Sequence, residues 1–103
     1  PHGDALAPDQ ANVDETYGRR SDAFGPDEVG SHPASRSPLG IDDMAGNVWE
    51  WVTGPGGAPV ARGGSFYYTT TIARIANRET PVAEYRDISV GMRVCSSVVK
   101  PPA

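Results

Sequence analysis

Two carboxylates in the middle of the chain, Asp43 and Glu50, flank a turn that contains Gly46. A turn of this kind can fold both carboxylates towards one point. Calcium takes about six to eight oxygen ligands and combines carboxylates with backbone carbonyls, so irregular acidic loops suit it. Acidic turns are more often simply solvated, so the spacing alone leaves a cation site and a solvated loop both open.

Thiol and imidazole groups offer less chemistry. Cys95 is the single cysteine, so no disulfide can form within this sequence, and we expect a small buried residue rather than a reactive thiol. His2 and His32 lack H-x-x-x-H spacing and have no neighbouring cysteine. A transition-metal site is therefore not indicated.

The charge pattern bears on the class of partner. The formal net charge is −4, from 9 basic and 13 acidic residues, and the basic residues stand singly apart from Arg19 and Arg20. There is no basic stripe to neutralise phosphates, and no apolar run approaches the roughly 18 residues of a membrane span. We therefore expect neither a nucleic-acid nor a membrane partner.

The elements that must position these groups are expected to be short. Glycine and proline make up 12 and 10 of the 103 residues, which predicts many turns and little long helix. Residues 1–38 are polar and turn-rich with single apolar anchors, typical of irregular structure. Residues 48–52 alternate apolar and polar and predict a strand, and residues 53–59 predict a turn.

Further along the chain, residues 60–68 predict a second strand, in which Gly63 and Gly64 indicate a bulge or a close backbone approach. Residues 72–78 fit a strand or a short helix, and residues 88–99 predict a last strand. Trp49 and Trp51 are expected to bury core area on the strand faces. The apolar clusters are too few to close a core, so we expect the chain to need additional protein surface.

Residues 43–51, Asp-Met-Ala-Gly-Asn-Val-Trp-Glu-Trp, resemble the signature of the formylglycine-generating enzyme (sulfatase-modifying factor) family. A chance match to nine residues with two tryptophans is negligible. Companion matches follow the family's order along nearly the whole chain: residues 1–4, 11–13, 29–33, 62–66, the pair Arg74 and Arg78, and residues 91–93.

The resemblance implies an α+β fold with little regular secondary structure, similar to the C-type lectin fold and pinned by calcium. The family element that resembles residues 1–3 lies about midway through its domain. Residues 1–103 then correspond to the C-terminal half of one domain, and the fold is incomplete in this chain. The N-terminal half is either missing or on another chain, and we expect it as a partner.

Carried over position by position, the resemblance implies two calcium sites. One falls on Asp43, Gly46, Val48 and Glu50, with the glycine and the valine contributing carbonyls. The second falls on Asn12, Val13, Asp22 and Phe24, although one residue is missing before Val29 relative to the family pattern. Calcium is the expected cofactor.

One departure from the family pattern bears on activity. Members that make formylglycine use two cysteines just after the Gly-Gly-Ser element, which bind copper(I) as soft thiolates do. Residues 65–74 contain no cysteine, and Cys95 lies beyond the Gly-x-Arg element. We therefore expect that this domain does not generate formylglycine.

Three functions fit these features. The first is a module that binds a protein or small-molecule ligand through Tyr67, Tyr68, Thr70 and Arg78, although the tyrosines and threonines also suit an ordinary strand. The second is an oxidative enzyme of the same superfamily, acting in iron-dependent sulfur–carbon bond formation or siderophore modification. Its metal ligands would lie upstream, with Tyr67 or Tyr68 as proton donor. The third is a scaffold. Arg62, Arg74 and Arg93 are expected to form structural ion pairs, with Arg78 the exception.

Overall fold

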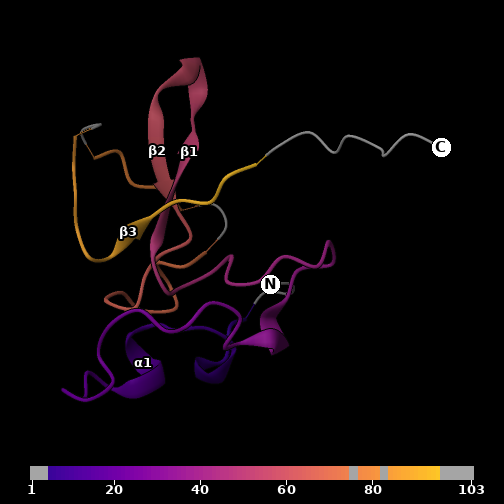
Figure 1. Ribbon diagram of the computed structural model, residues 1–103, viewed down its shortest axis with the longest axis vertical. Coiled ribbons are helices and arrows are strands. Elements are labelled where there is room, and N and C mark those ends of the chain that lie inside the picture. Colours follow the sequence, from indigo (N-terminus) through magenta and orange to yellow (C-terminus); the bar gives the residue numbers. More distant parts are fainter. Residues whose placement is uncertain (1–4, 75–76, 82–83, 96–103) are drawn as a thin grey trace.

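The computed structural model describes residues 5–74, 77–81 and 84–95. Its regular elements are the helix α1 (Asp14–Tyr17) and the strands β1 (Trp49–Thr53), β2 (Pro59–Arg62) and β3 (Val90–Gly91). The strands form one sheet in the order β2-β1-β3. Figure 1 shows the β1–β2 hairpin at one end and α1 at the other, joined by long irregular segments. The expectation of a small α+β structure with little regular secondary structure is confirmed.

The β1–β2 hairpin follows the sequence closely. The strands are antiparallel, with Glu50 opposite Arg62 and Thr53 opposite Pro59. Their connection is a short 3-10 turn, Pro55–Gly57. Gly56 has φ 69° in this turn, a left-handed conformation that favours glycine because glycine has no Cβ. The predicted strand and turn over residues 48–59 are thus confirmed.

The second predicted strand is wrong beyond Arg62. Gly63 and Gly64 have φ values of 99° and 74°, which turn the chain out of the extended conformation and end β2. The following segment packs as a loop on the signature, because the Phe66 amide donates a hydrogen bond to the Asn47 carbonyl at 2.9 Å. A Cβ on Gly63 would lie 2.9 Å from the Met44 carbonyl oxygen, so this glycine marks a close backbone approach, one of the two alternatives that the sequence indicated.

The later elements are shorter than predicted. Residues 70–73 form a turn, and among the described part of residues 72–78 there is neither strand nor helix. Residues 75 and 76 lie outside the described residues. The predicted last strand is reduced to β3, since residues 92–95 have no regular structure, and residues 96–99 again lie outside the described part.

The N-terminal third is irregular, as predicted. Its helix α1 has four residues and ends where Gly18, at φ 63°, donates its amide to the Asp14 carbonyl at 3.1 Å. Along the described ranges, no helix is long and apolar enough to cross a bilayer.

The core is built largely from small side chains. A buried cluster of Ala11, Val13, Ala45 and Ala73 is joined by the partly buried Leu6. Trp49 is 3% exposed, which confirms its predicted role, whereas Trp51 is half-buried. Small side chains bury little apolar area, so this core contributes modest stability.

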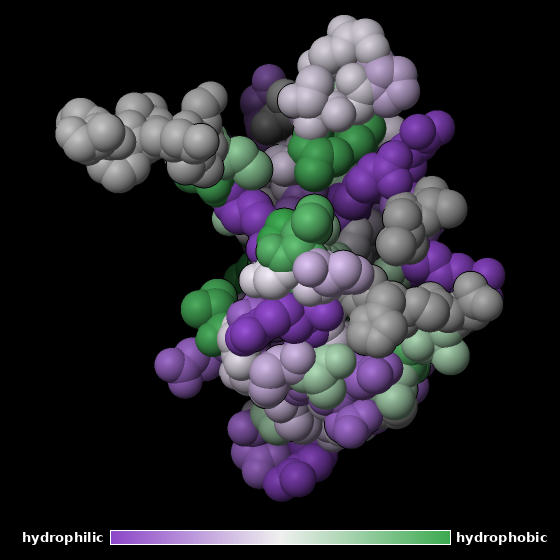
Figure 2. All heavy atoms as spheres, turned by 90° about the vertical axis from the view of Figure 1, so that its right-hand side faces the viewer, coloured by the Kyte–Doolittle hydropathy of each residue, from purple (hydrophilic) through white to green (hydrophobic). Residues whose placement is uncertain are grey.

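Several large apolar side chains remain on the surface. Figure 2 shows such residues on one face separated by hydrophilic ones rather than gathered in a single patch. The most exposed of them, between 70% and 86%, are Val29, Leu39, Ile88, Met92 and Val94. Cys95 is also exposed, and the expectation of a buried thiol is wrong, because the segment after β3 does not pack into the core.

Candidate functional site

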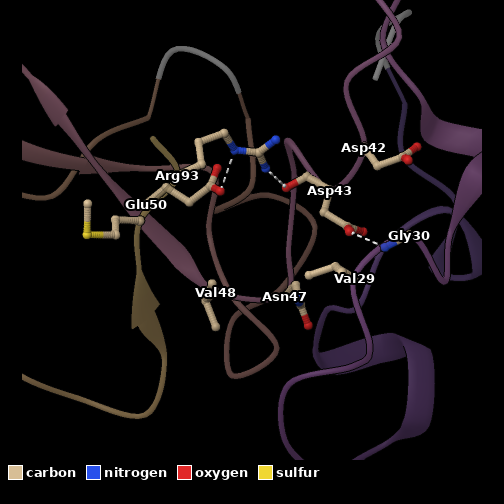
Figure 3. Close-up of a pocket in the computed structure, with 9 residues that line it drawn as sticks. Val29, Gly30, Asp42, Asp43, Asn47, Val48, Glu50 and Arg93 are labelled. Carbon is tan, nitrogen blue, oxygen red and sulfur yellow. Dashed lines mark hydrogen bonds and ion pairs between the residues drawn. The ribbon is translucent and has the colours of Figure 1, made fainter. Parts of the chain in front are cut away.

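Asp43 and Glu50 line the same pocket, of about 370 Å³ (Figure 3). The lining residues come from the loop before β1, from β1 itself, from the loop around Gly30 and from the segment after β3. They are Val29, Gly30, Asp42, Asp43, Asn47, Val48, Glu50, Met92 and Arg93. The turn therefore brings the two carboxylates of the signature to one hollow, as their spacing suggested.

The Asp43 end of the pocket is fixed by backbone geometry. Asp43 has φ 58°, a left-handed conformation that aspartate tolerates better than most residues. Its carboxylate accepts a hydrogen bond of 2.7 Å from the Gly30 amide. The contact ties together two loops that lie 13 residues apart in the sequence.

The Glu50 end is held by a cation from the C-terminal segment. The parallel pairing of β1 with β3 places Glu50 beside Gly91 and so brings Arg93 to the pocket. The Arg93 Nε donates to Glu50 Oε1 at 2.7 Å, and its terminal Nη2 donates to the Asp43 carbonyl at 3.2 Å (Figure 3). The predicted structural pairing of Arg93 is thereby confirmed.

Asp42 is the third carboxylate of the pocket and has a partner of its own. Both of its oxygens accept from Arg36, at 2.9 and 3.2 Å. This pair of hydrogen bonds lowers the pKa of Asp42 below its ordinary value. In Figure 3 the Asp42 side chain points away from Arg93, so it marks the rim of the pocket.

Three of the four residues predicted for the first calcium site, Asp43, Val48 and Glu50, meet at this pocket. Gly46 does not line it, and its amide donates to the Gly63 carbonyl at 2.7 Å. Among the described residues, no group of three or more His, Cys, Asp or Glu side chains is arranged to hold a metal. Two carboxylates and adjacent carbonyls fit calcium in kind, but a bound ion would need carbonyl or water oxygens for most of its ligands.

The four residues predicted for the second calcium site have separate partners, unlike the residues of the first site, three of which line one pocket. Asn12 is buried, and its amide nitrogen donates to the Gly25 carbonyl at 2.7 Å and to Asn47 Oδ1 at 3.2 Å. The Asp22 carboxylate is 65% exposed and pairs with Arg20. The Val13 carbonyl accepts from the Thr16 amide. None of these contacts joins Asn12 to the Asp22 carboxylate, and the second site stays a prediction.

The predicted ligand-binding residues form part of an aromatic surface. Tyr67 and Tyr68 are 47% and 37% exposed, and their rings lie 5.4 Å apart. Phe24 belongs to the second predicted calcium site, and its ring lies 5.8 Å from that of Tyr67. The Arg19 guanidinium covers Tyr67 at 4.6 Å. These four residues are called the aromatic surface below.

Thr70 and Arg78, the other two predicted ligand-binding residues, are placed differently. The Thr70 amide donates to the Glu15 carboxylate at 3.2 and 3.1 Å, which fastens the loop after the tyrosines to α1. Arg78 and Arg74 are both exposed. The structure therefore supports a packing role for Thr70 and leaves the role of Arg78 a prediction.

A buried cluster around His32 had no signal in the sequence. The His32 ring is 8% exposed, with Nδ1 3.0 Å from the Asp9 carbonyl and Nε2 2.8 Å from Asp27 Oδ2. Both ring nitrogens thus face oxygen acceptors, which favours the doubly protonated imidazolium. The Tyr17 hydroxyl donates to the same Asp27 oxygen at 2.7 Å, and this hydrogen bond raises the pKa of Tyr17.

The His32 cluster predicts a pH dependence of stability. Burial lowers the pKa of His32, but the hydrogen bonds to Asp27 and to the Asp9 carbonyl outweigh it, so the pKa is raised. The stabilisation is complete below the unfolded-state pKa of about 6.5 and is lost as the pH rises through the higher folded-state pKa. We expect the free energy of unfolding, measured with urea at a series of pH values, to fall above about pH 6.5, and His32→Gln to abolish that slope.

Asp27→Asn is the matched variant for this prediction. Without the carboxylate, burial dominates the pKa of His32 and lowers it, so stability should instead be lost on acidification. His2 is common to all three proteins and cancels in the comparison. Equal slopes above about pH 6.5 in the wild type and His32→Gln would contradict the assignment.

The chain is a small domain with one three-stranded sheet, long irregular loops and an acidic turn whose Glu50 pairs with Arg93. The family described as "Sulfatase-modifying factor enzyme 1-like domain" matches residues 1–98, so the chain belongs to this family. The resemblance drawn from residues 43–51 and their companions is thereby confirmed.

One relative has a more specific name. The hercynine oxygenase of Mycolicibacterium thermoresistibile is 47% identical to this chain over 34 residues. The match covers 33% of this chain and 8% of that protein. The chain therefore corresponds to a small part of the relative's length, and the activity of the whole relative does not transfer with the match.

Proposed function

We propose that this chain is part of a calcium-stabilised binding or scaffold domain of the sulfatase-modifying factor family and does not generate formylglycine. The observation that carries the proposal is that two oxygens, one near each end of residues 43–51, contact the same positive charge. Glu50 Oε1 and the Asp43 carbonyl both contact the Arg93 guanidinium. A position that already holds a cation on a carboxylate and a carbonyl suits calcium, which takes the same two kinds of ligand.

Binding is supported by the aromatic surface. Tyrosine provides rigid amphipathic contact area at small entropic cost, and Tyr67 and Tyr68 are both partly exposed. We place the ligand of the domain, a protein or a small molecule, at this surface. The exposed apolar side chains Val29, Leu39, Ile88, Met92 and Val94 fit a second proposal, that the N-terminal half of the same domain packs against this chain as its partner.

The calcium site is tested with Glu50→Gln and Asp43→Asn. Each variant removes one negative charge from the pocket, and the charge count of a site sets its calcium affinity. We expect calcium binding, measured by isothermal titration calorimetry after chelator treatment of the intact protein, to weaken by at least about tenfold in each variant.

Asp9→Asn is the matched control, since it removes one carboxylate from an exposed position outside the pocket. Its calcium affinity should equal that of the wild type. Asp22→Asn reports separately on the second predicted site. A wild type that binds no calcium, or a Glu50→Gln variant with unchanged affinity, would refute the proposed site.

A second candidate function is part of an oxygenase, and the match to hercynine oxygenase is the observation that favours it. Iron ligands would then come from another part of the polypeptide, and Tyr67 or Tyr68 would act as proton donor. Elemental analysis of the intact protein, purified without chelator, separates the two functions. Calcium at one or two ions per chain supports the binding module, whereas stoichiometric iron supports the oxygenase.

A further inference from the structure

We infer that α1 and Arg19 hold the aromatic surface in a preformed binding shape, with Glu15 and Arg19 as its positioning residues. This inference rests on the proposed function, which places the ligand at that surface, and adds how the surface is kept ready for the ligand. It concerns the loop of residues 67–70, which carries both tyrosines.

Helix α1 holds the backbone of this loop at two points. The Asp14 amide donates a hydrogen bond to the Tyr68 carbonyl at 2.9 Å. The Thr70 amide donates to the two carboxylate oxygens of Glu15, at 3.2 and 3.1 Å, and this contact is charge-assisted. Because Glu15 and Thr70 lie 55 positions apart in the sequence, their contact fixes where the loop lies and not merely its local shape.

Arg19 holds both the backbone and the ring of Tyr67. Its Nη2 donates to the Tyr67 carbonyl at 3.2 Å, and its guanidinium lies 4.6 Å from the centre of the Tyr67 ring and 5.8 Å from that of Phe24. The guanidinium is itself fixed, because its Nε donates to Asp14 Oδ1 at 2.6 Å. A planar guanidinium can make all of these contacts at once, whereas the ammonium group of a lysine is a point charge. Arg19 therefore sets the orientation of the Tyr67 ring.

Local hydrogen bonds give the loop its internal shape but not its orientation. The Tyr68 amide donates to the Ser65 carbonyl and the Ile72 amide to the Thr69 carbonyl, both at 3.1 Å. Each of these bonds joins residues three positions apart and would move with the loop as a unit. The Tyr68 ring has a further support, since it lies 5.5 Å from the ring of the buried Trp49. The other tyrosine of the loop therefore depends more on α1 and on the arginine.

A preformed surface binds a ligand more tightly than a mobile one. Tyrosines that are already ordered lose little freedom when the ligand binds, so the entropic cost of ordering them is avoided. Glu15 therefore contributes to affinity through the loop, without contact with the ligand.

The first test measures amide hydrogen exchange in the intact protein by NMR. Glu15 is exposed, so Glu15→Ala removes no core packing. It should speed exchange of the Thr70 amide by at least about tenfold, because exchange reports local opening. Glu15→Gln keeps an oxygen that can accept from this amide, and its exchange should stay within about threefold of the wild type. The Trp49 amide, which donates to the Ser89 carbonyl at 2.6 Å, is the internal control and should exchange equally in all three proteins.

Arg19 is tested by the mobility of the Tyr67 ring, measured by ¹³C relaxation. Arg19→Lys keeps the positive charge beside Asp14 but loses the planar guanidinium, so the ring should become as mobile as in Arg19→Ala. Arg20→Lys is the matched control, since Arg20 pairs with Asp22 and its side chain is 68% exposed. The Tyr67 ring should keep its wild-type mobility in this variant. Full rescue by Arg19→Lys would show that the charge alone suffices and would contradict the positioning role of Arg19.

The last test measures binding, with p-cresol as the probe. This small phenol can contact aromatic rings as a tyrosine of a partner would. Its dissociation constant is obtained from the NMR shifts of the Tyr67 and Tyr68 rings. Glu15→Ala should weaken binding by at least about fivefold, because the tyrosines must then be ordered on binding, whereas Glu15→Gln should match the wild type.

The outcomes separate the two proposals. If Thr70 exchange is unchanged in Glu15→Ala, or if this variant binds p-cresol as tightly as the wild type, the inference fails while the placement of the ligand stands. If the wild type shows no binding at the two tyrosines, the placement of the ligand fails and the inference fails with it. Faster Thr70 exchange without a change at Trp49, together with weaker p-cresol binding, supports the inference.

Discussion

Gly46→Ala is expected to lower the free energy of unfolding by more than about 3 kcal/mol, close to the largest effects that single substitutions produce. A Cβ at this position would lie 2.6 Å from the Asn12 carbonyl oxygen, which is backbone and cannot swing aside. The same oxygen accepts the Asn47 amide at 2.7 Å, so relieving the clash breaks a hydrogen bond. The φ of 72° adds the cost of a left-handed conformation, about 1–2 kcal/mol. Urea denaturation followed by tryptophan fluorescence measures the change.

Gly56→Ala separates the two contributions to this loss of unfolding free energy, the steric clash and the cost of the left-handed conformation. Gly56 has φ 69°, nearly the value at Gly46, but a Cβ there would meet nothing within 4 Å. It should therefore lose only about 1–2 kcal/mol. If the two alanine variants were equally stable, the close approach of Gly46 to Asn12 would not be what holds the signature in place.

The features predicted well from the sequence are those with a local cause. The alternation of apolar and polar residues over residues 48–52 gives β1, and the cluster of glycine and proline after Thr53 gives the tight turn. Gly63 and Gly64 signalled a backbone approach, and a Cβ on Gly63 would lie 2.9 Å from the Met44 carbonyl oxygen. For the strand and the turn, the signal and the structure lie within a few residues of one another, whereas Gly63 marks its own bend but not the segment that it approaches.

The features that the sequence did not predict depend on contacts between distant irregular segments. His32 reaches the Asp9 carbonyl 23 residues away, and no periodic pattern marks a loop that will bury an imidazole ring. Arg93 was expected to form an ion pair, but its partner Glu50 lies 43 residues away and is set by the short parallel pairing of β1 and β3. β3 itself is too short for a composition-based prediction to delimit.

Residues 43–51 contain both features that a local pattern predicts and features that depend on contacts with distant segments. Their strand residues are recognisable from their pattern, whereas the turn residues Asp43, Gly46 and Asn47 all have positive φ. Such a turn presents backbone and side chains to three other segments at once. The pocket therefore depends on the turn as much as on its own carboxylates, and Asn47 ties the turn by hydrogen bonds to Asn12, Asp27 and Phe66.

Asn47→Ala is expected to destabilise the protein by about 3 kcal/mol. The Asn47 side chain accepts hydrogen bonds from the Asp27 amide at 2.7 Å and from the Asn12 amide nitrogen at 3.2 Å. Alanine leaves both donors without this acceptor, and an unsatisfied buried donor costs about 1–3 kcal/mol. Asn47 also has φ 66°, which asparagine tolerates better than alanine. Chemical denaturation of the wild type and the variant measures the loss.

Asn47→Gly is the variant that separates the two causes. Glycine removes the same side-chain hydrogen bonds but adopts positive φ without strain, so Asn47→Gly should be more stable than Asn47→Ala by about 1 kcal/mol. Asn47 also lines the pocket beside Glu50 and Arg93, so both variants should weaken calcium binding in proportion to the loosening of the turn. If Asn47→Gly were as stable as the wild type, the hydrogen bonds to Asp27 and Asn12 would contribute nothing, and the turn would be held by its backbone alone.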